Sequence, residues 1–427
     1  IKRRRSSSTN SLARTSVIMS SQSSSPLATT ALVGAAAAAS TYAVYKFASK
    51  SSKASSFTSA YILAGDIGGT NSRLALFDPA LAEPTGTAKP PEPIFTHTYR
   101  NLETLKHRDG DLTYAKDIIL PFLTTCFEEQ GIPERDCIVA CFAVAGPVRQ
   151  NRVVMTNVGD HSPSADGKPK GVLLIDGNLI EATHESYLSK IVRLKIVNDF
   201  VGQGYGALDL SLDDECLELV PGSKDKIDPL GPKVCVGAGT GLGECFLTIS
   251  SLDPDAGYEC YPSEGGHVEY APRSDLEIEL LKYLKDKFKQ AHRVSVERVV
   301  SGKGLANVYE FLAKKYPDRV DKAIHSKFVA AGDMQGAVVG MNAGIKGSLM
   351  EQAMHIMVAA YGSEVGSSAL KFIPTGGLYV SGGLTPKNIK FINGDDSPFI
   401  KAFFDKGRVS PLLDGVPVFA VMNEDIG

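Results

Sequence analysis

Tryptophan is absent from this chain of 427 residues, and its seven cysteines contain no C-x-x-C pair. Scattered cysteines in odd number argue against a disulfide scaffold or a cysteine-based zinc site, and they favour reduced thiols in a reducing compartment. The sequence also has no G-x-x-x-x-G-K-[ST], and the body after residue 60 has no G-x-G-x-x-G. A P-loop fold and a dinucleotide-binding Rossmann fold therefore lose support.

Acidic residues are absent from residues 1–60, which hold eight Lys or Arg and 17 Ser. A basic, serine-rich, acid-free segment is typical of an organellar targeting peptide. Residues 27–45 are uncharged and long enough to span a membrane, although Ala, Thr, Ser and Gly dominate them. Three interpretations stay open for this leader: a transit peptide or disordered tail, a weak membrane anchor, or a helix packed on the body. The expected location is accordingly the cytosol, a plastid or a mitochondrion.

The chain begins with Ile1 and stops at Gly427, directly after a strand-like segment. We therefore expect a fragment at both ends, with Met19 as a candidate natural start and a final helix missing after Gly427.

The remainder of the chain carries 37 basic and 48 acidic residues, whereas the whole chain has a formal charge of −3. This acidic body argues against a nucleic-acid-binding core. Its length exceeds the roughly 100–200 residues of one domain, so two domains are expected. An acidic stretch rich in Pro and Gly at residues 213–232 places the domain boundary near residues 205–232.

Two segments share the pattern strand, glycine turn, strand. In the first, strands at 61–67 and 72–77 flank Gly68-Gly69, and in the second, strands at 234–236 and 245–249 flank residues 237–243. Each unit predicts a hairpin, not a strand followed by a helix. The remaining spacing predicts helices at 113–130, from the capping box Ser274–Glu277 to about residue 290, and from about 342 to 372. It predicts further strands at 138–144, 173–175, 194–197 and 378–381.

Both glycine turns suit a phosphate. The first, Gly65-Asp66-Ile67-Gly68-Gly69-Thr70-Asn71, lets phosphate oxygens approach backbone N–H groups and adds two donor side chains. Asp66 is placed to hold Mg²⁺ through water, because Mg²⁺ keeps most of its hydration shell. The second, residues 237–243, alternates glycine with other residues around Thr240. Alone, each turn is equally consistent with a plain hairpin, but together two such hairpins on two domains could clamp one polyphosphate.

From about residue 60 to residue 427, the body closely resembles the bacterial-type, ATP-dependent glucokinases of the hexokinase/actin-like superfamily. The resemblance rests on seven motifs in the family's order: LAGDIGGTNSRLALFD (63–78), MTN (155–157), VNDF (197–200), GAGTGLG (237–243), SEGGHVEYAP (263–272), VSVERVVSGKGL (294–305) and YVSGGL (379–384). It implies an α/β sugar kinase of the two-domain actin-like, ribonuclease H-like fold, with a cleft between a small domain (61–209) and a large domain (210–427).

The resemblance also implies the site residues. Asp199 corresponds to the catalytic base, and the expected sugar ligands are Asn157, Asn198, Asp199, Glu264, His267 and Glu297. The expected nucleotide contacts are Gly65, Asp66, Ile67, Gly68, Gly69, Thr70, Asn71, Gly239, Thr240, Gly241, Gly382 and Gly383. Asp66 is the expected link to Mg²⁺, through water.

Carboxylates and amides suit this task, because a sugar presents hydroxyls that both donate and accept hydrogen bonds. Phosphoryl transfer needs one carboxylate to receive the hydroxyl proton, and we expect an ordinary Asp pKa near 4 to suffice. Structural explanations stay open: Asn198-Asp199 as a helix cap, Glu264 and His267 as a surface turn, and Glu297 as a partner of a helix dipole. A metal site at Glu264 and His267 lacks a third ligand at a standard spacing.

The expected activity is transfer of the ATP γ-phosphoryl group to the 6-hydroxyl of D-glucose, which gives glucose 6-phosphate and ADP at the start of glycolysis. The absence of cysteine directly after His267 favours this branch over related sugar kinases that carry a zinc motif there. The long stretch 158–172 leaves hexose selectivity open. The alternatives are a kinase of another hexose or a catalytically weak sugar sensor. Glucose and ATP are the expected partners, and nucleic acid is not expected to bind. Membrane contact is expected only through residues 27–45, and a homodimer is compatible with the resemblance.

Overall fold

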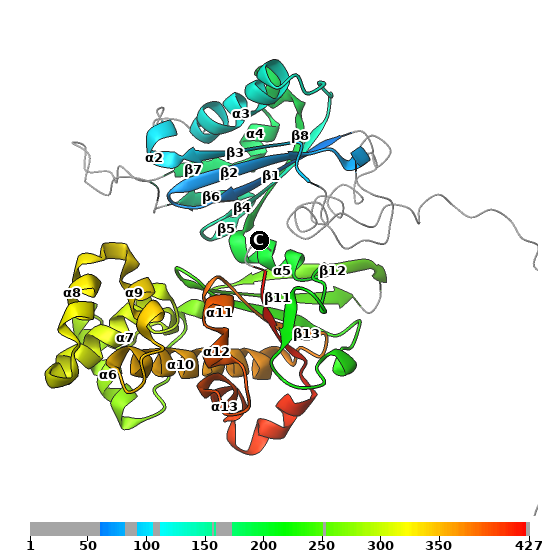
Figure 1. Ribbon diagram of the computed structural model, residues 1–427. Coiled ribbons are helices and arrows are strands. Elements are labelled where there is room, and N and C mark those ends of the chain that lie inside the picture. Colours follow the sequence, from blue (N-terminus) through cyan, green and yellow to red (C-terminus); the bar gives the residue numbers. More distant parts are fainter. Residues whose placement is uncertain are drawn as a thin grey trace, which may run out of the picture. The chain divides into compact units, whose positions relative to one another are not determined.

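The computed structural model describes residues 60–81, 92–105, 112–155, 158, 173–250 and 253–423 (Figure 1). These residues all belong to one compact unit, Leu32–Gly427. Leader residues 1–59, Asn157 and the predicted loop at 160–171 lie outside them. None of the helices in the described ranges combines the length and apolarity needed to cross a bilayer.

The first part of the chain contains a mixed five-stranded sheet with the strand order β3-β2-β1-β4-β8. Its strands are β1 (Tyr61–Ile67), β2 (Asn71–Phe77), β3 (Phe95–Arg100), β4 (Ile138–Val144) and β8 (Ile191–Asn198). The β1–β2 and β2–β3 pairs are antiparallel, and the β1–β4 and β4–β8 pairs are parallel. The predicted opening hairpin is therefore confirmed.

A second, six-stranded sheet has the order β12-β11-β10-β13-β14-β9. Its strands are β9 (Cys216–Glu218), β10 (Lys233–Ala238), β11 (Leu242–Ser250), β12 (Asp253–Ser263), β13 (Gly377–Ser381) and β14 (Val418–Val421). Over β12-β11-β10-β13-β14 it repeats the order and strand directions of the first sheet. The sequence showed only a similar pattern of hairpins, whereas the structure shows a duplicated sheet. Residues 213–232, to which no strand was assigned, contribute β9 at its edge.

The first sheet buries one face against a helical segment that matches the predicted helix at 113–130. That segment consists of α3 (Leu120–Thr124) between two π-helical turns, η4 (Ala115–Ile119) and η5 (Thr125–Glu129). Alternate residues of β4, such as Ile138 and Phe142, join this core, while Val139 and Cys141 face the other side of the sheet. The remaining elements here are α2 (Asn101–Thr104), α4 (Gly177–Glu181), η6 (Ser186–Lys190) and a small sheet of β5 (Val148–Arg149), β6 (Arg152–Met155) and β7 (Leu173–Asp176).

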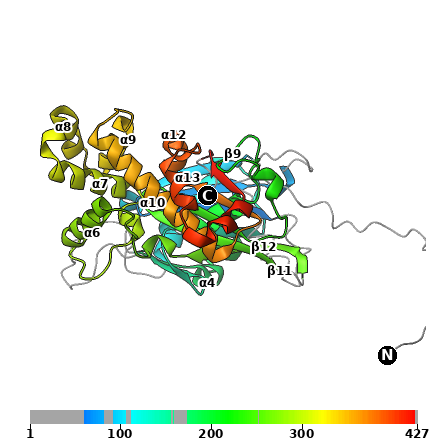
Figure 2. The ribbon, with the colours of Figure 1, turned by 90° about the horizontal axis from the view of Figure 1, so that it is seen from below.

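Helices cover one face of the second sheet, with α10 (Leu349–Phe372) at the centre of their core. Beside one end of α10 lie α6 (Asp275–Lys287), α7 (Gly302–Lys315), α8 (Lys322–Ala330) and α9 (Gln335–Asn342), as both ribbon views show (Figures 1 and 2). The prediction of a helix from about residue 342 was wrong at its start. The chain turns at Gly347, where φ is +73°, and α10 begins only after its N-cap Ser348.

The chain continues through α11 (Leu384–Lys387), α12 (Ile389–Ile392) and α13 (Pro398–Phe404).

The predicted cap of α6 is confirmed in its first half, because Ser274 Oγ accepts a hydrogen bond from the Glu277 N–H at 3.3 Å. The Glu277 carboxylate instead accepts from Tyr270 Oη at 2.5 Å and from the Arg273 N–H at 3.3 Å.

Helix α5 (Asp199–Gly206) packs against strands of both sheets. Its sequence alternates glycine with larger residues, and the glycines let it approach closely. A Cβ added at Gly204 would lie 2.5 Å from Cys260 Sγ and 2.6 Å from Cys245 Sγ. Val201 and Tyr205 fill the buried layer between α5 and the second sheet. A side chain at Gly204 must therefore displace the two cysteine side chains or the strands that carry them.

We expect Gly204→Ala to lower the free energy of unfolding by about 1–3 kcal/mol, because the new methyl overlaps two buried sulfur atoms. Denaturant titration measures this change. Gly415→Ala is the matched control, since a Cβ at Gly415 meets nothing within 4 Å. Equal stability of the two variants would contradict close packing of α5.

Candidate functional site

Asp199 stands where β8 ends and α5 begins. Asn198 is the N-cap of α5, and its Oδ1 accepts a hydrogen bond from the Phe200 N–H at 2.9 Å. Asn198 Nδ2 donates to the Gly146 carbonyl at 3.3 Å. The capping interpretation of this pair is thus correct for Asn198, and the cap fixes the direction in which Asp199 leaves the strand.

Burial, with smaller contributions from the negative charges of Asp66 and Glu264, raises the pKa of Asp199 to about 6. The Phe200 N–H, which donates to Asp199 Oδ1 at 2.9 Å, opposes that shift. This pKa lies above the expected ordinary value near 4, since the sequence shows neither the burial nor the neighbours. The first sheet aligns Ile67 of β1 with Val144 of β4 and Asn198 of β8, so Asp199 leaves the sheet at the same edge as the first glycine turn. Glu264 belongs to residues 263–272, called here the sugar segment.

The first glycine turn closes through a hydrogen bond from the Gly68 N–H to the Asn71 carbonyl at 2.9 Å, and Thr70 at its tip is exposed. Asp66 is the last residue but one of β1, with 53% of its side chain exposed and Arg73 Nη1 3.8 Å from its Oδ2. Partial burial raises its pKa, and Arg73 opposes the shift. A half-exposed carboxylate with so distant an ion-pair partner fits a cation held through water.

The second glycine turn joins β10 to β11, and Thr240 at its tip is exposed. Within it the Gly239 N–H donates to the Gly241 carbonyl at 2.8 Å, and the Gly239 carbonyl accepts from the Gly302 N–H at 2.9 Å. Gly382 follows β13, with φ at +80°, and a Cβ there would lie 2.5 Å from the Ala238 carbonyl oxygen. The predicted nucleotide segments at 239–241 and 382–383 therefore lie side by side.

The predicted sugar ligands Glu264, His267 and Glu297 come from two neighbouring segments. The Val296 N–H donates to the Val268 carbonyl at 2.9 Å, which joins the two segments. His267 Nε2 lies 3.8 Å from Glu264 Oε2, and both side chains are more than half exposed. The structure thus brings the two segments together and leaves the polar groups of Glu264 and His267 accessible.

Glu297 has a second contact that sequence reasoning missed. Its Oε2 accepts a hydrogen bond from the Leu242 N–H at 3.0 Å, and a Cβ at Gly241 would lie 2.5 Å from the same oxygen. It therefore stands against the second glycine turn as well as beside the sugar segment. Asn157, the remaining predicted ligand, lies outside the described residues.

Two further residues support the site: Phe200, which the sequence showed only as the last residue of the VNDF motif, and Tyr361, which no motif in the sequence indicated. The ring of Phe200, next to Asp199, lies over β11, and a Cβ at Gly243 would be 1.9 Å from Phe200 Cδ2. Tyr361 on α10 is buried, and its hydroxyl accepts from the Ala238 N–H at 3.2 Å and lies 3.2 Å from the Ser381 carbonyl. Tyr361 therefore ties together the two strand ends that lead into residues 239 and 382.

Beneath the sugar segment lies a buried carboxylate, Glu244 of β11. A Cβ at Gly265 would be 2.1 Å from Glu244 Oε2, which also accepts a hydrogen bond from Ser368 Oγ at 3.2 Å. Burial, aided by the negative charge of Glu364 and opposed by Lys371, raises the pKa of Glu244 to about 7.

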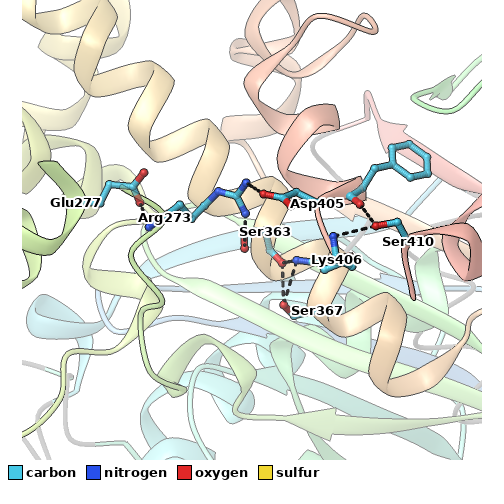
Figure 3. Close-up of polar contacts among 8 residues, drawn as sticks. Arg273, Glu277, Ser363, Ser367, Asp405, Lys406 and Ser410 are labelled. Carbon is cyan, nitrogen blue, oxygen red and sulfur yellow. Dashed lines mark hydrogen bonds and ion pairs between the residues drawn. The ribbon is translucent and has the colours of Figure 1, made fainter. Parts of the chain in front are cut away.

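Charged and hydroxyl side chains meet between α10 and the end of α13 (Figure 3). Lys406 Nζ donates to the Ser363 carbonyl at 2.8 Å, and Arg273 Nη2 pairs with Asp405 Oδ2 at 2.7 Å. Burial raises the pKa of the neighbouring Glu364, and the positive charges of Lys371 and Lys406 oppose the shift.

We expect the free energy of unfolding of Glu244→Gln to increase relative to that of the wild type as the pH rises from about 5 to about 8. The folded pKa is about 7 against 4.5 in the unfolded chain, so the folded protein binds the extra proton between these values. Wild-type stability therefore falls as pH rises through this window, by roughly 2–3 kcal/mol, and the amide has no such loss.

Denaturant titrations of both proteins across this pH range measure the difference. Asp396→Asn supplies the control: Lys401 lowers the pKa of Asp396, so this carboxylate is ionised in both the folded and the unfolded chain above pH 5, and its substitution should give a difference that does not change with pH over this range. A Glu244→Gln difference that does not change with pH would contradict the assignment.

The duplicated mixed sheet, with a glycine hairpin in each copy and a carboxylate at the helix between them, defines an actin-like sugar kinase fold. The structure matches the glucokinase of Balamuthia mandrillaris, solved in complex with glucose, with a TM-score of 0.63 at 20% identity, covering 91% of this chain and 96% of that one. It matches a glucokinase from an Antarctic psychrotroph with a TM-score of 0.56 at 26% identity, covering 86% and 95%. The predicted fold class is confirmed.

A family model described as Glucokinase matches residues 63–161 and 180–427. The glucokinase of Synechocystis sp. is 35% identical over 380 residues, covering 86% of this chain and 95% of that protein. The chain therefore belongs to the glucokinase family. The family match omits residues 162–179, which overlap the stretch that looked long in the sequence.

Proposed function

We propose that this protein transfers the γ-phosphoryl group of ATP to the 6-hydroxyl of D-glucose, giving glucose 6-phosphate and ADP. One observation carries the proposal: the first sheet aligns the end of β1 with the end of β8, so Asp199 stands beside the first glycine turn, and the charges of Asp66 and of Glu264 in the sugar segment both act on it. A base between a phosphate loop and a set of hydroxyl ligands is the arrangement that phosphoryl transfer to a sugar requires.

In this mechanism the Asp199 carboxylate accepts the proton of the attacking hydroxyl. Asn198, Glu264, His267 and Glu297 hold the other hydroxyls, and Asn157 is a further ligand. The two glycine turns, residues 65–71 and 239–241, hold the phosphates through the backbone N–H groups that do not close the turns and through Thr70 and Thr240, and Gly382-Gly383 lies against the adenosine. Asp66 would hold Mg²⁺ through water, and the ion would supply charge neutralisation at the phosphates.

The two sheets are, in this proposal, the cores of a small domain at 61–209 and a large domain at 210–427. Closure of one domain on the other around glucose excludes water and limits hydrolysis of ATP.

The leader, residues 1–60, directs the chain to an organelle, and a fusion of this segment to a fluorescent protein tests that role. We also propose that the protein forms a homodimer, and light scattering on the purified protein tests this.

We expect Asp199→Asn to lower kcat by at least about 10³-fold while glucose binding stays measurable by calorimetry, because the amide cannot accept the proton. With a base of pKa about 6, wild-type kcat/KM for glucose should rise with pH up to about 6 and then level off. Near-wild-type turnover of Asp199→Asn would remove Asp199 from this role.

Glucose should be the preferred hexose. Coupled assays with glucose, mannose and glucosamine measure kcat/KM for each sugar. A higher kcat/KM for mannose or glucosamine would replace the assignment with a kinase of that sugar, and binding of glucose without turnover of any hexose would favour a sugar sensor.

A further inference from the structure

Asn101, the first residue of α2, lies under the first glycine turn, and its side chain is fully buried. Its Nδ2 donates to the carbonyl of Gly68 at 2.8 Å and to that of Gly69 at 3.3 Å. Its backbone N–H donates to the carbonyl of Thr70 at 2.9 Å. One residue therefore holds three successive carbonyl groups of the turn.

A second buried group fixes the amide itself. Ser72 Oγ donates to Asn101 Oδ1 at 2.7 Å, and Ser72 is also fully buried. This bond sets the orientation of the amide, because Oδ1 must face the hydroxyl and Nδ2 must face the turn. In a site without water such hydrogen bonds are strong, and an unpaired group there is costly.

The three bonds determine where the donors of the turn point. In a planar trans peptide, the carbonyl of one residue and the N–H of the next point in opposite directions. Holding the carbonyls of Gly68, Gly69 and Thr70 on the Asn101 side therefore turns the N–H groups of Gly69, Thr70 and Asn71 to the opposite side. Those N–H groups belong to the proposed phosphate-binding set.

We propose that Asn101 is a positioning residue for nucleotide binding: it fixes the phosphate-binding conformation of the first glycine turn from beneath. This inference rests on the proposed function. Asn101 lies outside the sequence motif of the turn. It reaches the turn because β3, which pairs with β2, ends at Arg100, one residue before it (Figure 1).

Asn101→Asp tests the proposal, since it keeps the shape and the acceptor for Ser72 but replaces both donors with a carboxylate that faces two carbonyl groups. We expect affinity for ADP and for a non-hydrolysable ATP analogue, measured by calorimetry, to fall at least tenfold. KM for ATP should rise in parallel, while the glucose dissociation constant stays within twofold of wild type.

Asn151→Asp is the matched control. Asn151 Nδ2 donates to the Leu194 carbonyl at 2.8 Å and its Oδ1 accepts from the Ile196 N–H at 2.7 Å, so it makes the same kind of bonds to β8. This variant should lose stability without a change in nucleotide affinity. Equal loss of nucleotide and glucose affinity in Asn101→Asp, or unchanged nucleotide affinity, would overturn the proposal.

Ser72→Ala keeps the test decisive if Asn101→Asp does not fold. It removes only the bond that orients the amide, and we expect nucleotide affinity to fall about threefold to tenfold with glucose affinity unchanged. Unchanged nucleotide affinity in this variant would also overturn the proposal. Failure of the proposed function is distinguishable, because the wild-type protein would then bind nucleotide or glucose without turning them over.

Discussion

The close contact of α5 with the second sheet is the constraint on which the rest of the site depends. Phe200 lies where a side chain at Gly243 would have to be, and Gly204 brings the helix against two buried cysteine sulfurs. Asp199 precedes Phe200 directly, so its position follows from this packing. The position of the proposed base is therefore set by this close packing together with the Asn198 cap.

The duplicated sheet explains why two glycine turns recur at equivalent places. In each copy the turn joins a central strand to its antiparallel neighbour, β1 to β2 in the first and β10 to β11 in the second. Each turn is held by a buried polar residue from outside its motif. Asn101 binds carbonyl groups of the first turn, and the Tyr361 hydroxyl binds the strand end that leads into the second. The glycines permit the conformation, and these supports select it.

Electrostatics couples the site to its surroundings. Asp66 and Glu264 raise the pKa of Asp199, and Glu364 raises that of Glu244 beneath Gly265. Clustered carboxylates of this kind are costly in a bare protein, because burial and like charge both oppose ionisation. In the proposed function the cost is offset when the hydroxyls of a sugar and a hydrated cation enter the site.

The sequence by itself determined the central strands of both sheets, both hairpins, the Ser274 half of the α6 cap and the resemblance to the glucokinase family, because these depend on local pattern and short motifs. It assigned no strand to β3 or β12, which lie at the sheet edges. It placed Asp199 at the end of a strand correctly but expected an ordinary pKa. It also ran α10 too far back, since the break at Gly347 depends on a backbone conformation that spacing does not show. Only the tertiary structure decided that Glu297 contacts the second turn, that Asn101 lies beneath the first, and that residues 216–218 complete a sheet. These contacts join residues far apart in the chain, and burial, which sets their strength, exists only once the chain has folded.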